Sequence, residues 1–142
     1  MLFRSGLKIV QQDRTIPLEQ VAHIELLLLE NRLAIASTLV TPTPEIISHN
    51  TAQVEENIAE IEQTWNAYMA NHLTPAERTL AEKFAANRNR FINEALKPVL
   101  IALRTDDVKE ANNIVVQKIR PLYQPVEKDI QALVKLDRKS VV

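Results

Sequence analysis

The stretch LTPAE at residues 73–77 decides the fold, because it ends one helix and begins the next. Thr74 is of a residue type preferred at a helix N-cap, and Pro75 suits the first helical position, where no backbone N–H is needed. Glu77 stands three residues after the cap, where its side chain can close a capping box. The stretch therefore predicts a sharp turn between two helices near the middle of the chain.

Two further stretches carry the same kind of helix boundary. VTPTPE at residues 40–45 places Thr43 as a cap before a proline, and RTDDVKE at residues 104–110 places Asp107 three residues before a glutamate. Three short connections make four helices and require neighbouring helices to run antiparallel. The expected helices span roughly residues 5–40, 44–72, 75–105 and 107–140.

Apolar residues recur in each segment with the alternating three-and-four spacing of helices that pack side by side. With 142 residues, the chain is long enough for one such domain, which we expect to span residues 1–142. The predicted fold is an all-α, antiparallel up-down-up-down four-helix bundle with helices 1 and 4 longer than helices 2 and 3. Four prolines fall inside the helical segments, where we expect kinks and not breaks: Pro17, Pro98, Pro121 and Pro125.

The first predicted helix is apolar on nearly all sides, since Leu26, Leu27, Leu29 and Leu33 join its inner stripe. A monomeric bundle would leave part of this surface in water. We therefore expect helix 1 to pack against helix 1 of a second copy, forming a homodimer. Because the outer helices are longer, both chain ends are expected to project from the same end of the bundle.

The composition argues against several function classes. The formal net charge is −1, from 17 basic and 18 acidic residues, so no overall field attracts nucleic acid or an anionic membrane. The chain has no cysteine and one glycine, which excludes thiolate metal sites and glycine-rich phosphate loops. The three histidines, His23, His49 and His72, are too far apart along the predicted bundle to share a metal. We expect no enzyme activity, no metal and no cofactor.

We expect neither a membrane span within this chain nor a signal peptide at its start. No apolar run approaches the roughly 20 residues that a membrane span requires. The start, MLFRSGL at residues 1–7, lacks the basic region and apolar core of a signal peptide. We therefore expect a soluble unit that is a piece of a longer protein.

The stretch KFAANRNRF at residues 83–91 places Arg88 on the same stripe as two phenylalanines. A buried guanidinium must meet an acid, reach solvent or face a cavity that an anion fills. Counting from the turns sets Arg88 level with Tyr123 and with residues 58–62. Together with Phe91, these groups would suit a small carboxylate. The alternative is that Arg88 reaches solvent or pairs with Glu62 or Glu94.

Other polar residues on or beside the inner stripes are ambiguous. Arg14 and Asn31 interrupt the stripe of the first helix, and Asn31 is suited either to ligand binding or to fixing helix register. Arg32 points either to a partner subunit or to water. Arg90 faces away from Arg88, and we expect it to be exposed.

Five stretches, taken in order, are similar to the periplasmic four-helix-bundle sensor domain of bacterial methyl-accepting chemotaxis receptors. They cover nearly the whole chain: GLKIVQQDRTIPLEQ at 6–20, LTPAE at 73–77, FAANRNRF at 84–91, LKPVLIAL at 96–103 and RPLY at 120–123. The resemblance implies a homodimer packed through helix 1, and transmembrane helices before and after the chain. It also implies a periplasmic domain of an inner-membrane transducer coupled to a cytoplasmic kinase complex.

The resemblance also implies a ligand site for a small molecule that carries a carboxylate. The matching positions are Arg32 with Asn31, Arg88 with Phe91, and Tyr123. Amino-acid-sensing members have several arginines along the distal part of helix 1, whereas this chain has only Arg32 there. The resemblance therefore favours an organic or aromatic acid over an amino acid.

The expected mechanism is a shift of helix 4 against helix 1 by an ångström or two when ligand binds. Two other functions fit the same fold. One is the sensor domain of a histidine kinase or another membrane signalling protein. The other is a helical interaction module without a small ligand.

Overall fold

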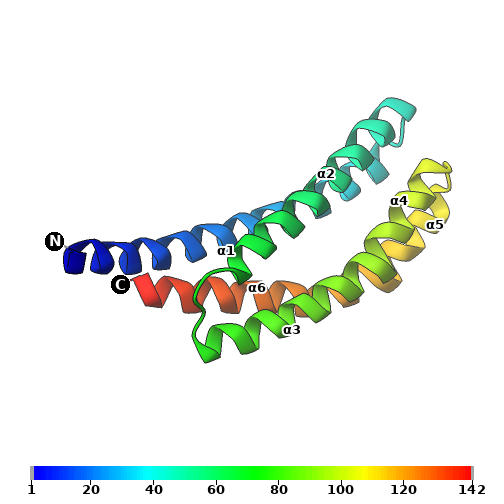
Figure 1. Cartoon of the computed structure of the whole chain (residues 1–142). Coiled ribbons are helices and arrows are strands. Elements are labelled where there is room, and N and C mark those ends of the chain that lie inside the picture. Colours follow the sequence, from blue (N-terminus) through cyan, green and yellow to red (C-terminus); the bar gives the residue numbers. More distant parts are fainter. Residues whose placement is uncertain (1, 142) are drawn as a thin grey trace.

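The computed structural model describes the backbone of residues 2–141 and the side chains of residues 15–140. The chain forms four antiparallel helical rods (Figure 1), which confirms the predicted all-α bundle. Arg14 lies outside the described side chains. The first two rods are α1 (Leu2–Val40) and α2 (Pro44–Met69). The third comprises α3 (Pro75–Phe91), the π-helical turn η1 (Ile92–Leu96) and α4 (Lys97–Arg104), and the fourth comprises α5 (Val108–Ile114), the π-helical turn η2 (Val115–Ile119) and α6 (Arg120–Val141).

The rods have unequal lengths. The helix α1 has 39 residues and α2 has 26. In Figure 1 the N- and C-terminal ends lie close together at one end of the molecule, and α1 and α6 extend past the turn between α2 and α3 there. The predicted placement of both chain ends is therefore observed.

The helix starts are fixed by the capping residues that the sequence indicates. The Thr74 hydroxyl accepts the backbone N–H of Glu77 at 3.1 Å, and the Glu77 carboxylate accepts the backbone N–H of Thr74 at 2.8 Å. Both halves of a capping box are therefore present. The side chains of Thr43 and Asp107 each accept a backbone N–H three residues further on.

The second helix ends earlier than predicted, at Met69 instead of position 72. The side-chain amide of Asn71 donates to the backbone carbonyls of Ala67 and Tyr68, at 3.3 and 3.0 Å. These carbonyls lie in the last turn, where intrahelical donors are missing. Asn71 satisfies them from outside the helix, and the chain is free to turn towards LTPAE.

The predicted kinks at Pro98 and Pro121 take a specific form. The π-turns η1 and η2 each end two residues before one of these prolines, and the helix then continues. A proline removes one backbone N–H and its ring crowds the carbonyl four residues back. A wider turn, with hydrogen bonds to the carbonyl five residues back, accommodates both effects. The helices α1 and α6 continue through Pro17 and Pro125 without such a turn.

The core contains an aromatic cluster between α2 and α3. The rings of Trp65 and Tyr68 stack with their centroids 5.3 Å apart, and Phe84 lies 5.0 Å from Trp65. All three residues are buried, and they lie on the predicted inner stripes. This cluster joins the two halves of the bundle near the LTPAE turn.

We predict that Thr74→Ala lowers the free energy of unfolding by about 1 kcal/mol, because the capping box loses one of its two bonds. Urea denaturation followed by circular dichroism measures the change. The control is Thr79→Ala, an exposed threonine of the same helix, which should change stability little because alanine favours helix. Equal effects of the two substitutions would contradict the capping role.

Candidate ligand-binding site

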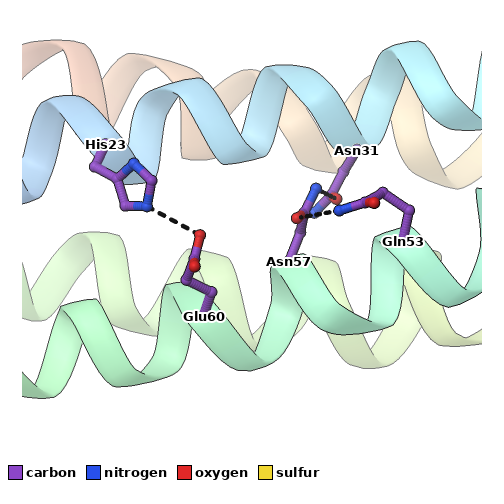
Figure 2. Close-up of polar contacts among 5 residues, drawn as sticks. All are labelled: His23, Asn31, Gln53, Asn57 and Glu60. Carbon is purple, nitrogen blue, oxygen red and sulfur yellow. Dashed lines mark hydrogen bonds and ion pairs between the residues drawn. The ribbon is translucent and has the colours of Figure 1, made fainter.

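Asn31 points into the bundle, towards Asn57 of α2 (Figure 2). The Asn57 side-chain amide donates to the Asn31 carbonyl oxygen at 3.0 Å, and Gln53 donates to the Asn57 oxygen at 3.0 Å. Asn31 and Asn57 are both buried. A buried pair of amides fixes the register of α1 against α2, since any slip would leave them without partners.

His23 and Glu60 make another polar contact between α1 and α2, which Figure 2 also shows. The His23 ring nitrogen lies 2.9 Å from the Glu60 carboxylate, and both side chains are about half exposed. A solvated pair of this kind contributes little to stability. With the bond from the Asn50 amide to the Thr38 hydroxyl, at 3.0 Å, polar contacts join α1 and α2 at three levels at least.

Arg88 is bound by a carboxylate of the protein. Its side chain is 4% exposed, and its Nη2 donates to Glu62 at 2.8 Å. The guanidinium carbon lies 5.6 Å from the centroid of the Trp65 ring and 6.0 Å from that of Phe84. Burial lowers the pKa of Arg88, and Glu62 opposes that shift. Nε and Nη1 have no hydrogen-bond partner among the described residues.

Arg32, Tyr123 and Phe91 form a cluster between α1, α3 and α6. The Arg32 guanidinium lies over the Tyr123 ring at 4.3 Å, and the Phe91 ring centroid lies 5.4 Å from that of Tyr123. Glu127 approaches Arg32 at 3.8 Å. Burial, followed by the charge of Glu127, raises the pKa of Tyr123, and Arg32 opposes the shift. The Tyr123 phenol therefore stays neutral and carries the arginine on its ring face.

The five predicted site residues thus do not meet at one point. Arg88 lies at the α2–α3 contact, Asn31 at the α1–α2 contact, and Arg32 with Tyr123 at the α1–α6 contact. Within the described part of the chain, no hydrogen bond or cation–ring contact joins Arg88 to Tyr123. Arg88 lies at the same height in the bundle as Glu62, as expected. The expected cavity lined by both Arg88 and Tyr123 is not observed among the described residues.

A cavity of about 430 Å³ lies between α1 and the α5–η2–α6 rod, and we call it the arginine groove. Its cations are Arg32 and Arg120, and Asn112 adds an amide. None of the described residues that line it is acidic. The other lining residues are apolar: Leu29, Leu33, Ile35, Ala36, Leu39, Val115, Val116 and Ile119.

Sequence reasoning did not single out Arg120, although this residue begins the RPLY stretch. The sequence did contain a local signal for this residue, because Arg120 directly precedes Pro121. In the structure it follows the wide turn η2. Two buried acids were also missed. Asp129 accepts from the Asn87 amide at 2.6 Å, and Asp137 accepts from the Tyr68 hydroxyl at 3.1 Å.

These features define a helical-bundle domain with a cation-lined groove between α1 and the α5–η2–α6 rod. The model of the family described as "Tar ligand binding domain homologue" matches residues 4–141. The chain belongs to this family. Searches of curated proteins and of solved structures gave no match.

The family match confirms the resemblance to the periplasmic sensor domain of chemotaxis receptors. The family consists of extracytoplasmic ligand-binding domains of membrane receptors and is not a catalytic family. Among the described residues, no helix is long and apolar enough to cross a membrane. Nor do the described histidines and acids gather in a group that could hold a metal ion.

The contact between Arg88 and Glu62 generates a stability prediction. Glu62→Gln should lower the free energy of unfolding by about 2 kcal/mol, because it leaves a buried guanidinium without a counter-charge. Arg88→Met should lower it less, since methionine removes the buried charge and keeps the length of the side chain.

Thermal and urea unfolding of both variants measure the difference, with Glu56→Gln on an exposed face of α2 as the control. A larger loss in Arg88→Met than in Glu62→Gln would contradict this description of the pair.

Proposed function

We propose that this chain is a chemoreceptor sensor domain that binds a small organic acid in the arginine groove. The observation that carries the proposal is that Arg32 and Arg120 line the same mostly apolar cavity without an acidic neighbour in the lining. Guanidinium groups hold carboxylates through paired, charge-assisted hydrogen bonds. Apolar walls around such a grip suit a ligand with an aliphatic or aromatic body.

The same lining favours an acid without an amino group. The ammonium group of an amino acid needs a carboxylate or several carbonyl oxygens when it leaves water. The groove offers two cations, one amide and eight apolar side chains. Glu127 lies close to Arg32, at 3.8 Å, but it does not line the groove. A simple organic or aromatic acid therefore fits better than an amino acid.

In this proposal Arg32, Tyr123 and Phe91 keep the roles expected of them. Arg32 binds the carboxylate, and Tyr123 and Phe91 hold Arg32 in position. Tyr123 underlies the Arg32 guanidinium, and Phe91 packs against Tyr123, so the arginine is oriented before ligand binds. Asn31 and Arg88 act in packing instead, through Asn57 and Glu62.

We infer further that two copies pair through α1. An exposed apolar stripe follows the coiled-coil spacing of four and three residues along this helix: Ala22, Leu26, Leu29, Leu33, Ala36 and Val40. Leu26, Leu29 and Leu33 are 50%, 47% and 60% exposed. A left-handed pairing of two such helices buries this stripe. Leu29 and Leu33 also line the arginine groove, so a partner seated on α1 would close it from one side.

Signal transmission follows from the position of the groove. Its two walls are α1 and the α5–η2–α6 rod, and both α1 and α6 run to the end of the molecule where the chain ends lie (Figure 1). A ligand that favours one spacing of these walls shifts α6 against α1 by an ångström or two. In the full-length receptor, that shift would pass through membrane-anchoring helices to a cytoplasmic kinase complex.

Arg120→Gln should weaken the binding of an organic acid at least about tenfold, because one charge-assisted hydrogen bond contributes about 1.5–3 kcal/mol. Calorimetric titration of a panel of monocarboxylates and dicarboxylates, each paired with its amide, measures this change. The control is Arg78→Gln, an exposed arginine of α3. Unchanged affinity in Arg120→Gln, or equal affinity for acid and amide, would refute the site.

Leu33→Glu should shift the chain from dimer to monomer, because two carboxylates would then face each other across the α1 pair. Sedimentation velocity measures the change. Ile101→Glu is the matched control, since Ile101 is 64% exposed but lies on α4. Identical sedimentation of Leu33→Glu and the unmodified chain would rule out pairing through this stripe.

A further inference from the structure

A second cavity, of about 610 Å³, lies between α2 and the α3–η1–α4 rod, and we call it the α2–α4 groove. It shares no lining residue with the arginine groove. Its volume lies within the range of roughly 300–1,000 Å³ that is usual for small-molecule sites. The proposed organic-acid site does not use it.

Both acids of the α2–α4 groove are already neutralised from the opposite wall. Glu62 accepts from Arg88 of α3 at 2.8 Å, and Glu55 is paired with Arg104 of α4. These two ion pairs cross the groove at different levels. On α2 the two acids are seven residues apart, which is about 10 Å at the helical rise. The stretch of groove between the two ion pairs is therefore long enough for a small molecule but too short for a partner helix.

Lys97 is the cation of this lining that lacks an acidic partner. The structure gives it no ion pair within residues 15–140, whereas Arg104 in the same lining is paired. Asn89 and Asn93 precede Lys97 by eight and four residues on the same rod, and all three side chains line the groove. Both amides are exposed and can donate hydrogen bonds. The uncompensated charge of the groove is thus positive.

The rest of the lining is apolar. Ile58 and Ala59 come from α2, and Ile92, Leu100 and Ile101 come from the opposite rod. Ile92 and Asn93 belong to the π-turn η1, which places an apolar and an amide side chain on the same wall. A carboxylate at Lys97 would therefore have its apolar body over isoleucine and leucine side chains.

We propose that the α2–α4 groove is a second ligand site, formed within one chain, for a short amphiphilic monocarboxylate such as an arylalkanoate. Lys97 holds the carboxylate, with Asn89 and Asn93 as hydrogen-bond donors. Ile58, Ile92 and Leu100 contact the apolar body. The two cross-groove ion pairs bridge the walls at two levels and limit ligand length to about 10 Å, the helical rise between the two acids.

The test is methyl NMR of the 142-residue chain with isoleucine δ-methyl labels, titrated with 3-phenylpropionate. Ile58, Ile92 and Ile101 report on the α2–α4 groove, and Ile35 and Ile119 report on the arginine groove. We expect saturable shifts at the first three methyls with 3-phenylpropionate, and much weaker ones with 3-phenylpropylamine. Shifts confined to Ile35 and Ile119, no shifts at all, or equal effects of acid and amine would overturn the proposal.

A pair of charge reversals assigns the anion contact. Lys97→Glu should weaken the 3-phenylpropionate response of Ile58, Ile92 and Ile101 by about fivefold or more, which corresponds to losing one exposed charge contact. Lys135→Glu changes the net charge equally at an exposed site on α6 and should leave it unchanged. Equal responses of the two variants would overturn the role of Lys97. Failure at these methyls with normal binding at Ile35 and Ile119 would leave the arginine groove intact.

Discussion

A guanidinium that leaves water needs a carboxylate within hydrogen-bond distance, and the arginines of this bundle differ in whether they obtain one. Arg88 pairs with Glu62 at 2.8 Å, and Arg104 pairs with Glu55. Both arginines therefore form ion pairs between α2 and the third rod. Among the described carboxylates, Arg32 pairs with Glu127 at the long distance of 3.8 Å, and it lies on the face of Tyr123. The arginine groove therefore combines a weakly paired Arg32 with Arg120, and that remaining positive charge is what an organic acid would neutralise.

Two of the prolines stand next to wide helical turns in the walls of the cavities. Pro98 and Pro121 each follow a π-turn, and such turns are rare in helices and frequent at functional sites. The turn η1 contributes to the α2–α4 groove, whereas η2 contributes to the arginine groove. Each cavity thus has a wide turn in its wall, where the helix lacks a regular hydrogen-bond ladder.

Much of the fold could be predicted from sequence, because capping residues and prolines act locally. LTPAE correctly predicts the turn between α2 and α3. The end of α2 was predicted too late, because the bond from the Asn71 side chain to the carbonyl of Tyr68 was not anticipated. The site was harder to predict. Counting along a helix gives the height of a residue but not the direction in which its side chain points. The extra residue in η2, which lies between the α4–α5 turn and Tyr123, also rotates the residues beyond it, which a regular helical count does not include. Arg88 and Tyr123 were therefore placed at one level but face different neighbours.

The most direct test of this account is a crystal structure of the chain bound to the carboxylate that it binds most tightly. The account predicts ligand density in the arginine groove, with the carboxylate between the guanidinium groups of Arg32 and Arg120. The pair formed by Arg88 and Glu62 should remain intact. A ligand carboxylate on Arg88, with Glu62 displaced into solvent, would contradict the account and restore Arg88 as the primary ligand residue.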